Sequence, residues 1–347
     1  MKLTFVINDI ATEQDNYTTI RLARRAIDMG HEVALVSIAD FVYEPDGRVS
    51  GFGKRPRRDS YENDTDILSH LQDAENEFEK ISMSDQDVVL LRSDPANEVI
   101  NRPWAPTSGL LFAQIIAAQG VIVLNDPSKL TDAQNKTYFQ TYPELVRPET
   151  LISRSTSEIK AFVEKMGGCA VIKPLQGSGG QGVFVIKDDS TPNLNVIIEA
   201  TVRDGYAIVQ EYLPKAAEGD LRLLTMNGKP LVVDGVYACF KRINKSGDGR
   251  SNITAGGTVE MAQPDEDALR LAELASLRLI QDGMYFAGLD IVGDKMMEIN
   301  VDTPGGINMA EDISGKDFSG AIIRDLEHKV RLKKNYPHTS SSGFVCI

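Results

Sequence analysis

The chain has 347 residues, of which 42% are hydrophobic and 25% are charged, the composition of a globular protein with about two or three packing units. Its 50 acidic and 37 basic residues give a net charge of −13, and such a surface repels phosphate backbones. We therefore expect neither a nucleic-acid binder nor a protein of anionic membranes. The three cysteines are scattered, the start has no signal-peptide pattern, and the longest apolar stretch, 110–124, is interrupted by polar residues. These features predict a cytoplasmic protein.

The first 125 residues alternate short apolar runs with helical patterns. The runs Leu3–Ile7, Val33–Ile38, Val88–Leu91 and Val121–Leu124 predict strands, and apolar spacing predicts helices around 20–27, 66–79 and 107–119. This alternation predicts a parallel sheet with helices on its faces. Between the second and third expected strands, residues 46–63 are rich in Gly, Arg and Asp and include Lys54, Arg55, Arg57 and Arg58. That segment either grips an anion or is a solvated loop, and charge runs are more often solvated.

The rest of the chain has a different texture, because strands dominate after Pro148. We expect Ser128 to cap a helix running toward Phe139. Further strands are expected at 170–174, 183–187, 207–213, 221–226, 231–237, 289–292 and 296–300, and helices at 157–166, 194–202, 265–283 and 317–331. Asn-Gly at 227–228 and Gly-Asp at 293–294 predict hairpin turns. The expected units are 1–125, 126–205 and 206–334, followed by a loose, serine-containing tail at 335–347.

A glycine-rich segment, Gly177–Gly182, satisfies the GxGxxG pattern. A strand precedes it, but a β-branched strand rather than a helix follows, so it does not predict a dinucleotide-binding turn. It predicts a hairpin lid whose backbone N–H groups can approach a phosphate closely, with Lys173 supplying a positive charge. The alternative is an ordinary hairpin loop, which four glycines in six residues make less favoured.

Two carboxylates and an amide, Asp290, Glu298 and Asn300, form a second constellation. Strand alternation puts Glu298 and Asn300 on one face. A three-residue turn at 293–295 would set Asp290 opposite Glu298, whereas a two-residue turn would place the two acids on opposite faces. Such hard oxygen ligands suit Mg²⁺. The alternative is a pair of surface acids on an edge strand.

Basic and polar residues lie between these motifs at Asp220, Arg222, Arg242, Arg250 and Asn252. Arginines stabilise charge on a transferring phosphoryl group and clamp carboxylates. Any one of them could instead form a surface ion pair. As a set that flanks a glycine loop and a carboxylate group, they favour a phosphate-handling site.

In this order and spacing, the motifs resemble the ATP-grasp superfamily, and more closely the prokaryotic type of glutathione synthetase. The carriers are VLLRSDP at 89–95, NDP at 125–127, NK at 135–136, VIKPL at 171–175, GSGG at 177–180, QEYLP at 210–214, GDLR at 219–222, RSN at 250–252, AGG at 255–257 and FAGLDIVGD at 286–294, which runs into EINV at 298–301. The resemblance covers residues 1–330. It implies an α/β chain in which an N-terminal Rossmann-like parallel-sheet domain precedes an ATP-grasp fold.

The resemblance also implies a role for each matching residue. The nucleotide phosphates would contact Lys136, Lys173, Gly177, Ser178, Gly179 and Gly180, and adenine would contact Gln210, Glu211, Tyr212 and Leu213. Mg²⁺, or Mn²⁺ in its place, would bind Asp290, Glu298 and Asn300. The phosphoryl and acceptor groups would face Arg222, Arg242, Arg250 and Asn252, and the substrates would lie near Arg92, Asp220, Gly305 and Gly306.

The implied reaction is ATP-dependent ligation of a carboxylate to an amine. A carboxylate attacks the γ-phosphorus of ATP to form an acyl phosphate, and an amine then displaces phosphate. In the family, the carboxylate belongs to γ-glutamylcysteine and the amine to glycine, with ADP and phosphate released. The expected partners are this dipeptide, this amino acid and ATP, without nucleic acid or membrane. The family also implies a homo-oligomer such as a tetramer.

One segment departs from the family. Residues 302–306 read Asp-Thr-Pro-Gly-Gly where the family often has Thr-Ser-Pro-Thr, a common basic residue is replaced around 307–309, and Ser93 replaces a common Lys. In the family the first segment borders the acceptor pocket. Two alternatives therefore stay open: an ATP-grasp peptide ligase with another amine or carboxylate, and a nucleotide-binding protein without catalysis. The second predicts gaps among the phosphate lysines and metal ligands, and the sequence has none.

Overall fold

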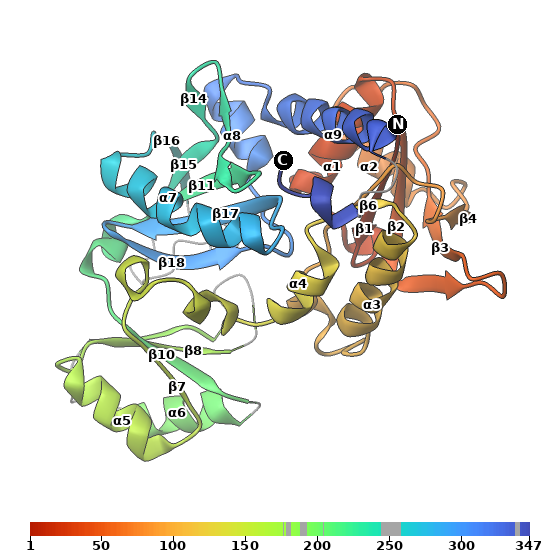
Figure 1. Cartoon of the computed structure of the whole chain (residues 1–347). Helices are drawn as coiled ribbons and strands as arrows, with labels where there is room; N and C mark the ends of the chain where they lie inside the picture. The colour runs from red at the N-terminus through yellow and green to blue at the C-terminus, as the bar shows by residue number, and fades with distance from the viewer. Residues whose placement is uncertain (176, 178–181, 188–192, 204, 244–257, 337–340) are drawn as a thin grey trace.

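The computed structural model describes residues 1–175, 177, 182–187, 193–203, 205–243, 258–336 and 341–347. Three large sheets organise them, and each of these belongs to a different region of the chain (Figure 1). The positions Ser178, Gly179, Gly180, Arg250 and Asn252 lie outside the described residues, so the roles expected for them stay predictions.

The N-terminal sheet has six strands in the order β4-β3-β2-β1-β5-β6. They are β1 (Lys2–Ile7), β2 (Glu32–Tyr43), β3 (Val49–Lys54), β4 (Glu79–Ser82), β5 (Val88–Leu91) and β6 (Ile122–Leu124). β1 runs parallel to β2 and β5, and β5 runs parallel to β6, which confirms the expected parallel sheet. β3 and β4 extend it with antiparallel pairs.

The sequence analysis missed β3 and β4. The basic segment that was expected as a loop is partly strand β3, and Lys54 at its end is buried and donates to the Asp73 carbonyl at 3.0 Å. Gly53 explains why the pattern was hidden, because a Cβ there would lie 2.2 Å from the carbonyl oxygen of Leu35. A glycine required by close strand packing reads as a loop signal in the sequence.

Helices cover both faces of this sheet: α1 (Thr18–Asp28), α2 (Asp64–Gln72), α3 (Ala105–Ala118) and α9 (Phe318–Asn335). Side chains of β1 alternate between two cores, with Phe5 in the cluster that includes α1 and α9, and Val6 in the cluster that includes α3. α9 comes from the far end of the chain and lies beside α1 (Figure 1). The C-terminal region therefore helps to build the N-terminal domain.

The tail was predicted to be loose, and that prediction is wrong for its last described residues. A short 3-10 helix spans Ser341–Phe344, and Phe344 and Val345 are buried in the core that contains β6. Lys329 of α9 is fully buried and donates to the carbonyl of Ile347 at 3.0 Å. Only a few apolar residues are needed to dock such a segment, too few to give a periodic signal.

The second sheet has the order β7-β10-β8-β9. Its elements are β7 (Thr150–Ser153), α5 (Thr156–Lys165), β8 (Ala170–Pro174), β9 (Phe184–Ile186), α6 (Leu194–Val202) and β10 (Ala207–Glu211). β8 and β9 are antiparallel, so the glycine-rich segment joins two strands, as expected. β10 pairs with β7 and β8. This sheet therefore continues to Glu211, beyond the boundary predicted at 205.

The third sheet has the order β16-β15-β11-β17-β18, with β12 paired to β11. Its strands are β11 (Asp220–Met226), β12 (Lys229–Pro230), β15 (Cys239–Ile243), β16 (Thr258–Met261), β17 (Phe286–Val292) and β18 (Lys295–Asn300). The helix α7 (Glu266–Gln281) packs on one face. The strand expected at 231–237 is instead a hairpin of β13 (Val232–Val233) and β14 (Val236–Tyr237), turned at Asp234 and Gly235 with φ of 50° and 76°.

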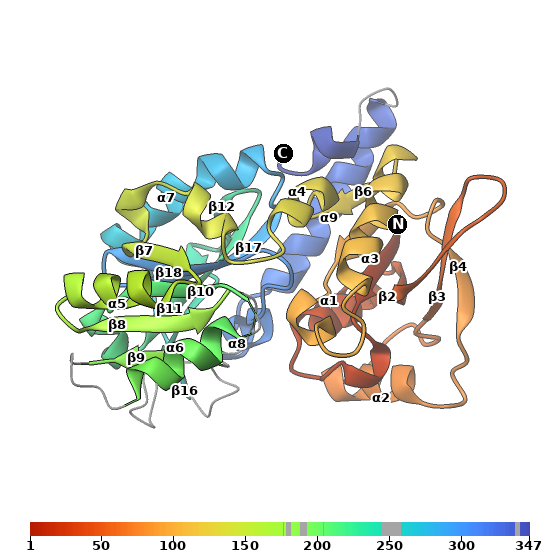
Figure 2. The ribbon, with the colours of Figure 1, turned by 90° about the horizontal axis from the view of Figure 1, so that it is seen from below.

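Short helices link the sheets. α4 (Pro127–Asp132) is capped by Asp126, whose carboxylate accepts from two backbone N–H groups, so Ser128 is not the cap. α8 (Ile307–Ser314) follows the third sheet, and further 3-10 turns span Ile10–Thr12, Pro95–Glu98, Tyr138–Thr141, Glu144–Val146 and Pro214–Glu218. Figure 2 shows the second and third sheets on one side of the molecule and the N-terminal domain on the other. None of the described helices combines the length and apolarity needed to cross a bilayer.

Candidate active site

A cavity of about 840 Å³ lies where the three regions meet. Successive side chains along the strands of the second sheet point to opposite faces. One face therefore packs on α5 and α6, and the other face turns toward the cavity. The predicted site residues that line it are Arg92, Lys136, Lys173, Gly177, Gln210, Arg222, Arg242, Asp290, Glu298, Asn300, Gly305 and Gly306. Residues distant in the sequence thus share one space.

The β17–β18 hairpin has the shorter of the two turns that the sequence analysis considered. Its turn has two residues, because Val292 pairs with Lys295. The register then shifts between Asp290 and Ile291, and this bulge brings Asp290 opposite Glu298. The predicted pairing of the acids is confirmed, but the bulge produces it rather than a longer turn.

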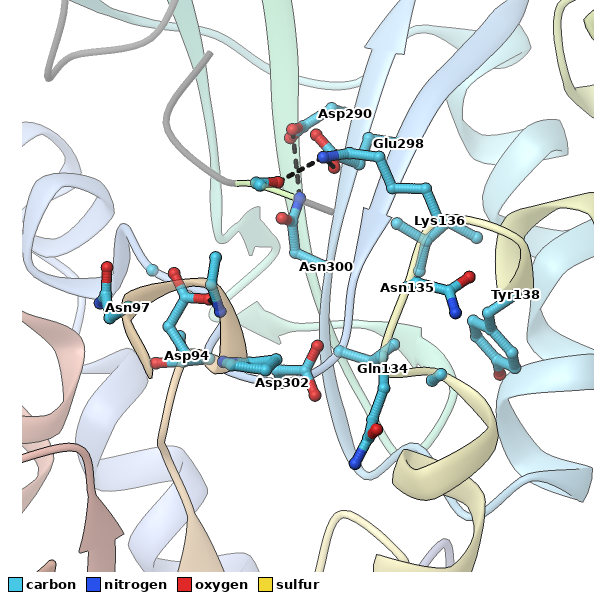
Figure 3. A pocket seen from close by; sticks show the side chains of 18 of the residues that line it. Asp94, Asn97, Gln134, Asn135, Lys136, Tyr138, Asp290, Glu298, Asn300 and Asp302 are labelled. Atoms are coloured by element: carbon cyan, nitrogen blue, oxygen red, sulfur yellow. Dashed lines mark hydrogen bonds and ion pairs between the residues drawn. The ribbon is translucent and has the colours of Figure 1, made fainter. Parts of the chain in front are cut away.

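Asp290 is the centre of a buried charge network, and Figure 3 shows it beside Glu298 and Asn300. Arg222 binds it with two nitrogens, Arg242 approaches its Oδ2 to 2.9 Å, and the amide nitrogen of Asn300 donates to the same oxygen at 3.2 Å. Burial raises the pKa of Asp290, but Arg222 and Arg242 outweigh burial and hold that pKa below its usual value. Asp290 is therefore an ionised carboxylate at neutral pH.

Arg242 is held in place from behind by Asp220. The Asp220 carboxylate accepts from both Nε and Nη2 of Arg242, and Asp220 is only 1% exposed. Asp220 does not line the cavity, which differs from its predicted place beside the substrate. Its contacts show that Asp220 instead positions Arg242.

Two lysines face the same end of the cavity. Lys136 donates to the carbonyl of Gly177 and lies 3.4 Å from Oε1 of Glu298. Burial, together with the nearby charge of Lys136, lowers the pKa of Lys173 to about 8 against the opposing charges of Glu298 and Asp290. A cationic pair over a glycine turn can neutralise phosphate oxygens.

The lowered pKa of Lys173 predicts a pH dependence. A lysine with a pKa of about 8 is charged below that pH and neutral above it, so the empty cavity should lose affinity for the expected anionic nucleotide as the pH rises through 8. We expect kcat/KM for ATP to fall above pH 8, measured between about pH 6.5 and 9.5 at saturating co-substrates. Lys173→Arg keeps its charge, so it should move this fall to higher pH. A fall at the same pH in the arginine variant would contradict the assignment.

The predicted adenine strand is only partly in contact with the cavity. Gln210 lines it and donates from Nε2 to Thr150 Oγ1 at 3.0 Å. Glu211, Tyr212 and Leu213 do not line it, and Glu211 accepts from the backbone N–H of Glu149 at 3.2 Å. Adenine contact by the last three therefore stays a prediction.

At the opposite end, the cavity is lined by the N-terminal domain. Arg92 donates to the carbonyl of Pro304 at 2.8 Å and to Thr19 at 3.3 Å, and burial lowers its pKa to about 10 against the opposing charge of Glu13. Glu13, Asp94 and Asp302 also line this end, and none was selected from the sequence. Asp94 could have been selected, because it follows the carboxyl end of the parallel strand β5, where ligands of such sheets bind.

The acid–amide group fits a magnesium ion in its donor chemistry. Asp290 and Glu298 supply carboxylate oxygens, and Asn300 turns its amide nitrogen to Asp290, which leaves its oxygen without a hydrogen-bond partner among the described residues. Magnesium prefers such oxygens and completes its shell with water and substrate phosphates. Among the residues that the structure describes, no group of three or more His, Cys, Asp or Glu side chains could hold a metal ion.

Comparison with known proteins gives consistent matches along the chain. The profile for the prokaryotic glutathione synthetase N-terminal domain matches residues 1–131, and the profile for the ATP-grasp domain of the same enzyme matches residues 135–315. A glutathione synthetase of Vibrio parahaemolyticus is 32% identical over 77% of this chain and 83% of its own length. One of Shewanella oneidensis is 34% identical over 76% of this chain and 82% of its own length.

Solved structures with the same fold are more distant in sequence. The D-cycloserine synthetase DcsG has a TM-score of 0.59 at 14% identity, covering 94% of this chain and 100% of that one. The ATP-grasp ligase PsnB, solved with a minimal precursor, Mg and ADP, has a TM-score of 0.58 at 13% identity, covering 95% and 98%. These neighbours confirm the expected ATP-grasp fold.

Proposed function

Since the chain belongs to the prokaryotic glutathione synthetase family, we propose that it joins γ-glutamylcysteine to glycine in an ATP-dependent, ADP-forming reaction. The observation that carries this proposal is the convergence of two lysines, two arginines and the acid–amide group on one cavity. A nucleotide-binding protein without catalysis would not need all of these charges in contact. The convergence therefore favours an enzyme.

The cavity end formed by the second and third sheets would take the triphosphate. Lys136 and Lys173 would neutralise phosphate oxygens, and Arg222 and Arg242 would stabilise the charge on the transferring phosphoryl group. The substrate carboxylate attacks the γ-phosphorus, and ADP leaves. The acceptor nitrogen then attacks the acyl carbon, and the carbon–oxygen bond to phosphate breaks.

The residues that would hold Mg²⁺ are Asp290, Glu298 and Asn300. When bound, the ion would supply charge neutralisation on the phosphate oxygens. Asp290 also orients Arg222 and Arg242 through their ion pairs, so the same carboxylate sets the position of both arginines. Little covalent chemistry is required from the protein, because positioning and charge carry a phosphoryl transfer.

The test is ADP release with Mg-ATP and γ-glutamylcysteine, with and without glycine. We expect release that requires both substrates and a product with the mass of glutathione. Substrate-dependent release with other dipeptides or amines, but not with this pair, would overturn the substrate assignment and keep the ligase chemistry. Absence of release with any carboxylate and amine would overturn the enzyme itself.

A second candidate is an ATP-grasp peptide ligase with another amine or carboxylate. It is favoured by the segment 302–309, because Asp302, Thr303 and Met309 line the cavity where the sequence departs from the family. Two finer expectations rest on the resemblance alone and stay part of the proposal: Mn²⁺ in place of Mg²⁺, and a homo-oligomer such as a tetramer. The cytoplasmic location rests on the sequence features given above and is likewise part of the proposal.

A further inference from the structure

Three carboxylates gather at the cavity end formed by the N-terminal domain. Glu13 follows the first 3-10 turn, Asp94 follows β5, and Asp302 follows β18, and all three line the cavity. Figure 3 shows Asp94 and Asp302 close together. Burial raises the pKa of Tyr17, and the nearby Glu13 and Asp94 both raise it further, so these two acids act on the same side chain.

Two arginines near this end of the cavity, Arg92 and Arg102, already have other hydrogen-bond or ion-pair partners. Arg92 places its guanidinium on the Pro304 carbonyl and the Thr19 hydroxyl. Arg102 forms an ion pair with Glu98 at 2.8 Å and approaches Asp9 to 3.9 Å. In the described part of the chain, no ion pair involves Glu13, Asp94 or Asp302. The acids at this end of the cavity therefore outnumber the cations that contact them.

Glu13 gives an independent sign of a missing partner. It is 7% exposed, and its Oε2 is buried without a hydrogen-bond partner among the described residues. Burying an unpaired carboxylate oxygen is costly, so such atoms normally meet a donor. A donor that arrives with the substrate would satisfy this requirement, because Glu13 lines the substrate cavity.

We propose that Glu13, Asp94 and Asp302 form a subsite that binds the ammonium group of the peptide substrate. This proposal rests on the proposed function and names which part of the substrate lies at which end. The reacting carboxylate must meet the phosphates beside Arg222 and Lys173. The ammonium group at the other end of the dipeptide then points toward the N-terminal domain, where the acids are.

The acceptor amine is the other source of an ammonium group. Its reacting nitrogen must be uncharged and must reach the acyl phosphate, which places it beside Asp290 rather than beside Glu13. The geometry therefore favours the dipeptide donor over the acceptor for the acidic subsite.

The experiment compares γ-glutamylcysteine with glutaryl-cysteine, which lacks only the amino group. Binding of each is measured by calorimetry with a non-hydrolysable ATP analogue and Mg²⁺, in the wild type, Asp302→Asn and Glu13→Gln. We expect the wild type to bind the aminated dipeptide about 10- to 100-fold more tightly, as is typical of hydrogen bonds to charged groups. Each variant should lose most of this preference while its affinity for glutaryl-cysteine stays unchanged.

Asp132→Asn is the matched control, because this acid is 62% exposed and pairs with Lys129 on α4. It should keep the full preference. Equal binding of both dipeptides by the wild type, or an equal loss for both in the variants, would overturn the subsite. An effect on the affinity for glycine instead of the dipeptide would overturn the assignment to the donor.

The two proposals fail in different ways. If the proposed function fails, the wild type releases no ADP with glycine and either dipeptide, whether or not the dipeptide carries the amino group. If only the subsite fails, turnover continues with the same efficiency for both dipeptides. Absence of binding for both dipeptides would overturn the proposed function, and the subsite with it.

Discussion

Asp290→Asn is expected to lower both the rate of the reaction and the stability of the fold. The substitution removes a carboxylate from the acid–amide group, and we expect kcat to fall by about 100-fold or more, as for loss of one preorganised charge in a transition-state site. It also leaves Arg222, which is 8% exposed, without its acidic partner. Breaking a buried ion pair costs about 3 kcal/mol, so the thermal midpoint should fall as well.

Glu298→Gln separates the two effects. The side chain of Glu298 is 37% exposed, and its ion pair among the described residues is the 3.4 Å contact with Lys136, so its loss should change stability by less than about 0.5 kcal/mol. Its rate should still fall by about 100-fold. ADP release at limiting and saturating Mg²⁺, together with thermal unfolding, measures both quantities, and Asp132→Asn is the control. Equal stability of the two active-site variants would contradict the central place of Asp290 in the arginine network.

The elements that the sequence predicted best have strong local signals. α6 has the predicted bounds, Leu194–Val202, and the four parallel strands of the N-terminal sheet lie within a few residues of their apolar runs. The elements that were missed depend on contacts far along the chain. β3 reads as a basic, glycine-containing loop, and it forms a strand because β2 offers a parallel-sheet edge for antiparallel pairing.

The site was predictable to a similar extent and for a similar reason. Residues that belong to the family motifs, such as Lys173, Arg222 and Asp290, do line the cavity. The bulge that aligns Asp290 with Glu298 has no sequence signal, since Met297 is an ordinary strand residue. Glu13 was invisible for another reason: its importance comes from burial beside Arg92, which the three-dimensional packing alone creates.

Gly306→Ala is expected to destabilise the wall of the cavity, whereas Gly305→Ala should not. Gly306 has a φ of 110°, and a Cβ there would lie 2.4 Å from the ring of Phe240, which is buried. The unfavourable backbone alone costs about 1–3 kcal/mol, and the overlap adds to it because the core ring has little room to move. A Cβ added to Gly305 would meet no described atom within 4 Å beyond its chain neighbours, so this alanine variant should keep the wild-type stability.

The pair of variants also tests how this wall contributes to activity. The backbone N–H of Gly306 donates to Thr18 Oγ1 at 3.0 Å, and the carbonyl of Gly305 accepts from Arg222 at 3.1 Å. Displacement of Gly306 by its new side chain would therefore move a group bound to Arg222, and kcat should fall with stability. Thermal unfolding and ADP release of both variants check this. A Gly306→Ala protein with wild-type stability and rate would show that Phe240 can yield, and that the φ of 110° is not required for the arrangement of Arg222.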